Sequence, residues 1–292
     1  MSRIEIHGSS IEFVDQGTGD PVMLLHCSGS SSGQWRALIE RLSARFRVIA
    51  PDLYGYGAST NWSGREAFSL DHEAALVDAL LGRLDQPAHL VGHSYGGAVA
   101  LNVARRHGHL LRSLTVIEPV AFHLLRGGGA PDAAALRQIL DITDIVVRSL
   151  ARGDYAGGYG SFVDYWSGSG SWAGIPAAKR DALAAHLPKV ALDFHATLNE
   201  PASIDDFRML AVPTLVLQGT STALPTQRIC KRLAASLPEV RFRTIAGAGH
   251  MLPLTHRDEV NDLIVEQLNE TAGAWSESAT SSSCQSPPLQ TV

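Results

Sequence analysis

The sequence is poor in cysteine and in charged residues. Of its 292 residues, three are cysteine and 18% are Asp, Glu, Lys or Arg. Cys27, Cys230 and Cys284 are an odd number of cysteines without C-x-x-C spacing. This pattern argues against a disulfide framework and against a cysteine-based metal site, and it favours a reducing compartment. We therefore expect a cytoplasmic protein that carries no metal.

The sequence also lacks a basic excess and a long apolar run. Its net charge is −5, so a nucleic acid is not an expected partner. No apolar stretch is long enough to span a bilayer, and the first residues show no secretory pattern. With 45% hydrophobic residues, the chain fits one sizeable domain, or a domain with an insertion. Whether it forms a homo-oligomer stays open.

What the sequence does contain is a regular alternation of strand and helix patterns. Short apolar runs predict strands at 4–7, 11–14, 22–25, 46–50, 89–91, 114–117, 213–219 and 240–245. Helical patterns separate most of them, at 34–42, 70–84, 226–237 and 258–269 and after residue 94. Such alternation predicts an α/β fold with a mostly parallel central sheet flanked by helices.

The alternation stops after Pro119 and returns near residue 206. Residues 120–205 show helical periodicity around a middle rich in glycine and aromatic side chains, and these glycines are expected to let the segment move as a lid. We therefore predict a core of residues 1–119 and 206–270, with a helical cap at 120–205. The polar, Ser-rich residues 271–292 are predicted to be a disordered tail.

A G-x-S-x-G pattern lies between one of these strands and the helix that follows it. The residues are Gly92-His93-Ser94-Tyr95-Gly96. A sharp strand-to-helix turn of this kind exposes a serine Oγ above the sheet, close to the free N–H groups of the helix. Ser94 is therefore a candidate nucleophile; the alternative is an ordinary turn without a catalytic role.

Four landmarks in order resemble the α/β-hydrolase superfamily, specifically its cap-bearing branch with a serine nucleophile. They are the His26 loop, residues 52–59, the Ser94 turn and residues 247–251. The resemblance implies a helical cap inserted after the sixth strand and identifies His250 as the base that activates Ser94.

The sequence departs from the resemblance at the acid that orients the histidine. The branch usually carries an Asp a few residues beyond the strand that ends at Gly219, where this chain has Thr222. Glu118, at the end of the preceding strand, is the predicted replacement, because some relatives, among them certain haloalkane dehalogenases, carry the acid there. The alternative is that Glu118 only opens the cap, and that water or Thr222 serves His250.

The resemblance also implies an oxyanion hole and a substrate pocket. The backbone N–H groups of Ser28 and Tyr95 are the expected oxyanion donors, although Cys27 replaces the usual glycine beside Ser28. The predicted substrate pocket consists of His26, Trp35, Tyr159, Tyr165, Trp166 and Met251.

These residues predict a serine hydrolase that cleaves a carboxylic ester, or a related acyl bond, of a small apolar or aromatic molecule. The reaction would pass through an acyl-enzyme without a cofactor. The same residues could hydrolyse a carbon–carbon bond next to a carbonyl, as in aromatic ring-cleavage products. A weakly catalytic, receptor-like protein is a third interpretation, motivated by the missing Asp. Epoxide and haloalkane hydrolysis are disfavoured, because they need a carboxylate at position 94.

Overall fold

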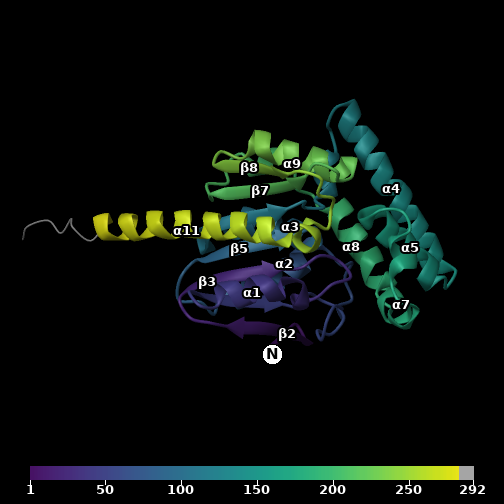
Figure 1. The fold of residues 1–292 in the computed structure, drawn as a ribbon, viewed down its shortest axis with the longest axis horizontal. Helices are drawn as coiled ribbons and strands as arrows, with labels where there is room; N and C mark the ends of the chain where they lie inside the picture. The colour runs from purple at the N-terminus through teal and green to yellow at the C-terminus, as the bar shows by residue number, and fades with distance from the viewer. Residues whose placement is uncertain (283–292) are drawn as a thin grey trace, which may run out of the picture.

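An eight-stranded sheet forms the centre of the molecule (Figure 1). The computed structural model describes the backbone of residues 1–282 and the side chains of residues 1–271. The strand order is β1-β2-β4-β3-β5-β6-β7-β8. The strands are β1 Ser2–Ile6, β2 Ser9–Gln16, β3 Asp20–Leu25, β4 Phe46–Pro51, β5 Ala88–His93, β6 Leu111–Ile117, β7 Thr214–Gly219 and β8 Val240–Ile245. Strand β2 pairs antiparallel with β1 and β4, and the other pairs of neighbouring strands are parallel, so the predicted mostly parallel sheet is confirmed.

Helices cover both faces of the sheet. Helices α1 (Arg36–Leu42) and α11 (Arg257–Ser282) share one core cluster, whereas α2 (Leu70–Leu81), α3 (Tyr95–His107) and α9 (Leu224–Ser236) contribute to the other. Successive residues of a strand belong to opposite core clusters, because side chains alternate between the two faces of a sheet. In β3, Met23 belongs to the α2–α3–α9 core and Leu24 to the α1–α11 core. This explains why the central strands read as continuous apolar runs.

A helical insertion separates β6 from β7, as predicted for a cap after the sixth strand. It contains the 3-10 helix η3 (Phe122–Leu125) and helices α4 (Ala130–Ala151), α5 (Tyr155–Ser167), α6 (Ser171–Gly174), α7 (Ala177–Ala184) and α8 (Leu187–Asn199). Figure 1 shows α4, α5, α7 and α8 grouped at one end of the sheet. The remaining short helices are η1 (Ser32–Trp35), η2 (Gly108–Leu110), η4 (Ile204–Phe207) and α10 (Leu252–Thr255).

Two glycines in the middle of the insertion allow close packing against the helix that contains them. Gly158 and Gly160 both lie inside α5 and are buried. A Cβ on Gly158 would lie 2.8 Å from the Leu187 side chain, and one on Gly160 would lie 2.6 Å from Trp172. These two glycines therefore allow neighbouring helices to approach α5, and movement of the glycine-rich segment as a lid stays a prediction.

Helix α11 is longer than expected. Its backbone continues to Ser282, through the first part of the segment predicted to be disordered. Extending an existing helix costs far less than nucleating one, and residues 272–282 contain alanine and glutamate, which favour helices. Residues 283–292, including Cys284, lie outside the described part of the chain.

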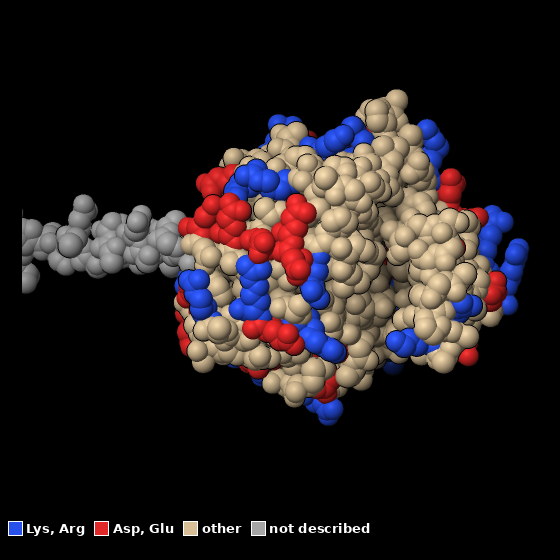
Figure 2. Space-filling model, viewed as in Figure 1, with Lys and Arg blue, Asp and Glu red and all other residues tan. Residues whose placement is uncertain are grey.

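Among the residues that the structure describes, no helix is long and apolar enough to cross a membrane. On the face drawn in Figure 2, basic and acidic side chains are interspersed over the half of the molecule that contains the sheet.

Candidate active site

Ser94 lies on a sharp turn between β5 and α3. Its backbone has φ 55° and ψ −115°, a region that non-glycine residues rarely adopt. The turn is possible because its glycines lack side chains. A Cβ on Gly92 would lie 2.3 Å from the Gly96 carbonyl oxygen. A Cβ on Gly96 would lie 2.4 Å from the Leu25 carbonyl oxygen. Such strain at a single buried serine is typical of functional sites.

His250 lies beside the Ser94 hydroxyl. It follows β8, and its Nε2 is 2.9 Å from Ser94 Oγ. Both side chains are nearly buried, with exposures of 4% for His250 and 5% for Ser94. The indole of Trp166, from α5 of the insertion, covers the imidazole with a ring-centroid separation of 4.2 Å. The insertion therefore shields this histidine from bulk water.

Glu118 lies on the opposite side of His250. Its Oε2 is 2.9 Å from His250 Nδ1 and its side chain is fully buried. The other oxygen, Oε1, accepts a 2.8 Å hydrogen bond from the Gly219 N–H. This arrangement assigns the Nδ1 proton to the Glu118 bond and leaves Nε2 to accept a proton from Ser94.

Thr222 occupies the place where an Asp was expected, and it contacts Glu118. Its hydroxyl donates to Glu118 Oε2, the same oxygen that faces His250. The Thr226 hydroxyl lies 3.0 Å from that of Thr222 and donates to the Ala223 carbonyl. The end of β7 and the loop after it thus supply hydrogen bonds to Glu118, which follows β6, and these bonds fix the orientation of its carboxylate.

His93, next to the nucleophile, fixes the position of the His250 loop. Its Nε2 is 2.9 Å from the His250 carbonyl oxygen, and its Nδ1 accepts from the Gln34 side-chain amide at 3.2 Å. Burial lowers the pKa of His93 to about 3, so the ring is neutral and Nε2 donates. The Gln34 Oε1 in turn accepts from the Cys27 N–H at 3.1 Å. One chain of hydrogen bonds therefore connects the loop after β3 to the His250 loop.

The predicted oxyanion donors lie in adjacent loops. The Gly96 N–H donates to the His26 carbonyl at 3.1 Å and so ties the start of α3 to the loop after β3. The Tyr95 N–H is the first of α3 and has no helical acceptor. Within the described residues, neither this amide nor that of Ser28 donates to a protein group. Both amides are therefore available to a bound group.

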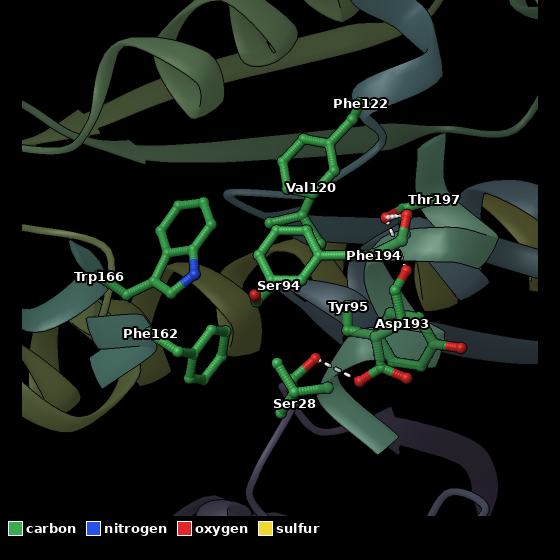
Figure 3. Close-up of a pocket in the computed structure, with 11 residues that line it drawn as sticks. Ser28, Ser94, Tyr95, Val120, Phe122, Phe162, Trp166, Asp193, Phe194 and Thr197 are labelled. Atoms are coloured by element: carbon green, nitrogen blue, oxygen red, sulfur yellow. Dashed lines mark hydrogen bonds between the residues drawn. The ribbon is translucent and has the colours of Figure 1, made fainter. Parts of the chain in front are cut away.

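Two cavities meet at Ser94. The inner chamber, with a cavity volume of about 20 Å³, is shown in Figure 3, where Phe122, Phe162, Trp166 and Phe194 surround the serine. The outer chamber, with a cavity volume of about 300 Å³, has a wall that includes His250. Residues that line both chambers are Ser28, Ser94, Phe162 and Trp166. Ligand sites are commonly apolar concavities of this kind with a few polar groups.

The structure places only part of the predicted pocket in these cavities. Tyr159, Trp166 and Met251 line the outer chamber. His26, Trp35 and Tyr165 line neither chamber.

Each of the three misplaced residues has another environment. His26 accepts from the Leu53 N–H through Nε2 and lies 2.7 Å from the Cys27 carbonyl through Nδ1, so it joins two loops; burial lowers its pKa to about 4. Trp35 is buried in the α1–α11 core, and Tyr165 packs edge-on against the Trp166 ring at 4.8 Å.

A buried charge cluster beside the inner chamber was not predicted. Lys189 Nζ donates to Glu73 Oε1 at 3.0 Å and also to Asp193 Oδ1. Asp193 Oδ2 accepts 2.6 Å hydrogen bonds from the Ser28 and Tyr56 hydroxyls. The Glu73, Lys189 and Asp193 side chains are at most 5% exposed. The cluster joins α2 of the core, α8 of the insertion and the loop that carries Ser28.

The electrostatics of this charge cluster are dominated by burial and by its charge pairs. Burial raises the pKa of Glu73, while the two neighbouring carboxylates raise the pKa of Lys189 despite its burial. The ammonium also lies over the ring of Tyr95, 4.6 Å from its centroid. Lys189 is thus held as a cation between two carboxylates. In the sequence, the only visible sign of the charge cluster is the i, i+4 spacing of Lys189 and Asp193, and this spacing is common on solvated helices.

The described side chains contain no group of three or more His, Cys, Asp or Glu residues that could hold a metal ion.

Comparisons with known proteins agree with this fold. The chain is similar to the 2-hydroxymuconate semialdehyde hydrolase of Pseudomonas putida, with 29% identity over 274 residues that cover 88% of this chain and 89% of that protein. The protein of the same name from Pseudomonas sp. (strain CF600) is 36% identical over 142 residues, 44% of this chain, so the match spans about half of that relative's length (49%).

A solved structure of a thermophilic esterase from Thermogutta terrifontis, with malate bound, is also similar. It has a TM-score of 0.72 and 25% identity, and the match covers 93% of this chain and 99% of that one. A family model described as the alpha/beta hydrolase family matches residues 22–263, which contain Ser94, Glu118 and His250. The chain therefore belongs to the alpha/beta hydrolase family.

Proposed function

We propose that this hydrolase cleaves a carboxylic ester of a small, apolar molecule through an acyl-enzyme on Ser94. The observation that carries the proposal is the continuous series of hydrogen bonds from Ser94 Oγ through His250 to Glu118, with two 2.9 Å steps. A serine hydroxyl is a weak nucleophile unless a base removes its proton, and a fixed imidazole supplies that base.

In the acylation step, Ser94 Oγ forms a bond to the carbonyl carbon while its proton passes to His250 Nε2. The carbonyl oxygen becomes an oxyanion and accepts hydrogen bonds from the Ser28 and Tyr95 N–H groups. When the bond to the alcohol oxygen breaks, His250 gives its proton to that oxygen. Glu118 stabilises the imidazolium that exists between these two transfers.

In the deacylation step, a water molecule takes the place of the alcohol. His250 removes one of its protons as the oxygen attacks the acyl carbon, and the bond to Ser94 Oγ then breaks. The serine recovers its proton from His250, so one ester and one water give one acid and one alcohol. Trp166, which covers the imidazole, limits the access of other water molecules.

Carbon–carbon bond hydrolysis is the second candidate, and the relatives named 2-hydroxymuconate semialdehyde hydrolases favour it. A muconate-type substrate carries a carboxylate, and a buried carboxylate needs a counter-charge. The residues that line the inner and outer chambers include no Arg or Lys. This observation supports the ester over the muconate-type substrate. The continuous hydrogen bonds at Ser94 also argue against a receptor-like protein with weak turnover.

The test is a substrate panel of p-nitrophenyl esters, lactones and vinylogous diketones, with fluorophosphonate labelling of the wild type and of Ser94→Ala. We expect ester turnover and labelling in the wild type, and neither in Ser94→Ala, with an unchanged circular dichroism spectrum. Ser167→Ala is a matched control, because Ser167 also lines the outer chamber. Faster turnover of diketones than of every ester would favour the second candidate, and full ester turnover by Ser94→Ala would overturn the mechanism.

A further inference from the structure

We propose that the inner chamber binds the acyl part of the ester, and that it accepts a short acyl group without a negative charge. The alcohol part would then occupy the outer chamber. This inference rests on the proposed ester hydrolysis and extends it to the class of substrate.

The position of His250 assigns the two chambers. In the tetrahedral intermediate, the carbon on Ser94 carries the oxyanion, the leaving oxygen and the acyl chain. The leaving oxygen must lie within hydrogen-bond reach of His250 Nε2, because this nitrogen protonates it. His250 lines the outer chamber, together with Met251 and Leu254, and does not line the inner one. The alcohol therefore leaves on the outer side, and the acyl chain points to the inner side.

The walls of the inner chamber limit the length of the acyl group. The chamber has a cavity volume of only about 20 Å³, far below the range of about 300–1,000 Å³ that is usual for small-molecule pockets. Its apolar walls include Phe122, and Val190 and Phe194 from α8. The rings of Phe122 and Phe194 are stacked, with centroids 5.8 Å apart. A long acyl chain would have to displace these side chains.

The charge of the inner chamber decides what the acyl group can carry. Asp193 is the only charged side chain among the residues that line it (Figure 3). The cation that contacts Asp193 is Lys189, which also donates to Glu73. The three side chains carry one positive and two negative formal charges. An acyl group with a second carboxylate would therefore meet a like charge without a free cation to balance it.

The first experiment tests the assignment of the chambers with a pair of truncations. Phe194 lines the inner chamber and Leu183 the outer chamber, and neither lines both. We expect Phe194→Ala to raise kcat/KM for p-nitrophenyl octanoate, relative to the acetate, by about tenfold, the effect of a few methylene groups in a pocket. Its preference among acetate esters of different alcohols should stay as in the wild type. Leu183→Ala should change the alcohol preference and leave the acyl preference unchanged. If Phe194→Ala instead changes the alcohol preference and Leu183→Ala changes the acyl preference, the assignment of the two chambers is overturned.

The second experiment tests the charge. Wild-type kcat/KM for p-nitrophenyl hydrogen succinate should be about 100-fold below that for the valerate, which has a similar length. Asp193→Asn should raise the succinate-to-valerate ratio, while Ser28→Ala, which keeps the carboxylate, should leave it unchanged. Because ratios are compared, a loss of overall rate does not affect the result.

The outcomes separate the two proposals. Equal wild-type rates for succinate and valerate would overturn the charge argument, even if Asp193→Asn does not fold, and would leave ester hydrolysis standing. Failure to hydrolyse any ester would overturn both proposals.

Discussion

The Ser28 hydroxyl donates a 2.6 Å hydrogen bond to Asp193 Oδ2, across 165 positions of the chain. Ser28 is the residue whose backbone N–H is proposed to hold the oxyanion, and Asp193 belongs to α8 of the insertion. The insertion therefore takes part in positioning the loop after β3, besides covering the site.

Ser28→Ala is predicted to lower kcat with little change in KM. The variant keeps the backbone N–H but removes the bond that holds it, so it weakens an interaction made mainly in the transition state. Because hydrogen bonds to charged groups contribute about 1.5–3 kcal/mol, we expect kcat to fall by about tenfold or more. Steady-state kinetics with p-nitrophenyl acetate measures this. Ser28→Thr, which keeps a hydroxyl, should recover part of the rate; a rise in KM alone would contradict the prediction.

Glu118→Gln is predicted to lower kcat by about 10⁴-fold, as for other acids that set the tautomer of a catalytic histidine. Because the Thr222 hydroxyl contacts Glu118 Oε2, an Asp at position 222 would place a carboxylate close to His250. The double variant Glu118→Gln/Thr222→Asp should therefore recover at least part of the lost rate. Glu118→Gln/Thr222→Asn is the uncharged control. Equal rates for the two double variants would show that the loop after β7 cannot supply the acid.

Lys189→Met is predicted to destabilise the fold strongly. The change leaves Glu73 and Asp193 buried without their cation, and removing one partner of a buried ion pair costs about 3–5 kcal/mol. Urea unfolding followed by tryptophan fluorescence measures the loss. Lys179→Met, at an exposed position of α7, should be neutral. If Lys189→Met unfolds at the same urea concentration as the wild type and Lys179→Met, the buried ion pairs do not stabilise the fold.

Acid should begin to destabilise the protein as the pH falls below about 6.5. Burial lowers the pKa of four histidines from about 6.5 to about 4, or about 3 for one of them; they are His26, His89, His93 and His123. The unfolded chain binds protons at these groups first, so the free energy of unfolding falls as the pH drops from about 6.5 to about 4. Above about pH 6.5 these histidines are neutral in both the folded and the unfolded chain, so the free energy of unfolding is not reduced there.

His89→Gln isolates the contribution of one such histidine. We expect the pH dependence of the unfolding free energy to become shallower by up to about 1.4 kcal/mol per pH unit in that range. His195→Gln, on an exposed part of α8, is the control and should leave the slope unchanged. Identical slopes for the wild type and His89→Gln would contradict the assignment of a low pKa to His89.

The sequence was sufficient to predict the sheet and the three residues at its edge. Ser94, Glu118 and the His250 loop each follow a strand of the sheet, β5, β6 and β8 respectively. The carboxyl ends of parallel strands meet at one edge, so residues that follow them converge without knowledge of side-chain packing.

The charge cluster could not be predicted in this way. Lys189 and Asp193 are one helical turn apart and resemble a solvated pair, and only the docking of α8 against α2 buries them with Glu73. The same limit explains the misplaced pocket residues. The position of His26 in a loop does not reveal that its ring faces the Leu53 backbone.

The cluster of Glu73, Lys189 and Asp193 has a consequence for protein engineering. Residues 120–205 look like a module that could be exchanged for the cap of a relative to change substrate range. A chimera of this kind would remove Lys189 and leave Glu73 as a buried carboxylate on α2 without its cation. The Ser28 hydroxyl would lose its acceptor at the same time. Grafts into this scaffold should therefore either carry both residues of α8, or replace Glu73 with an uncharged residue and give the Ser28 hydroxyl another acceptor.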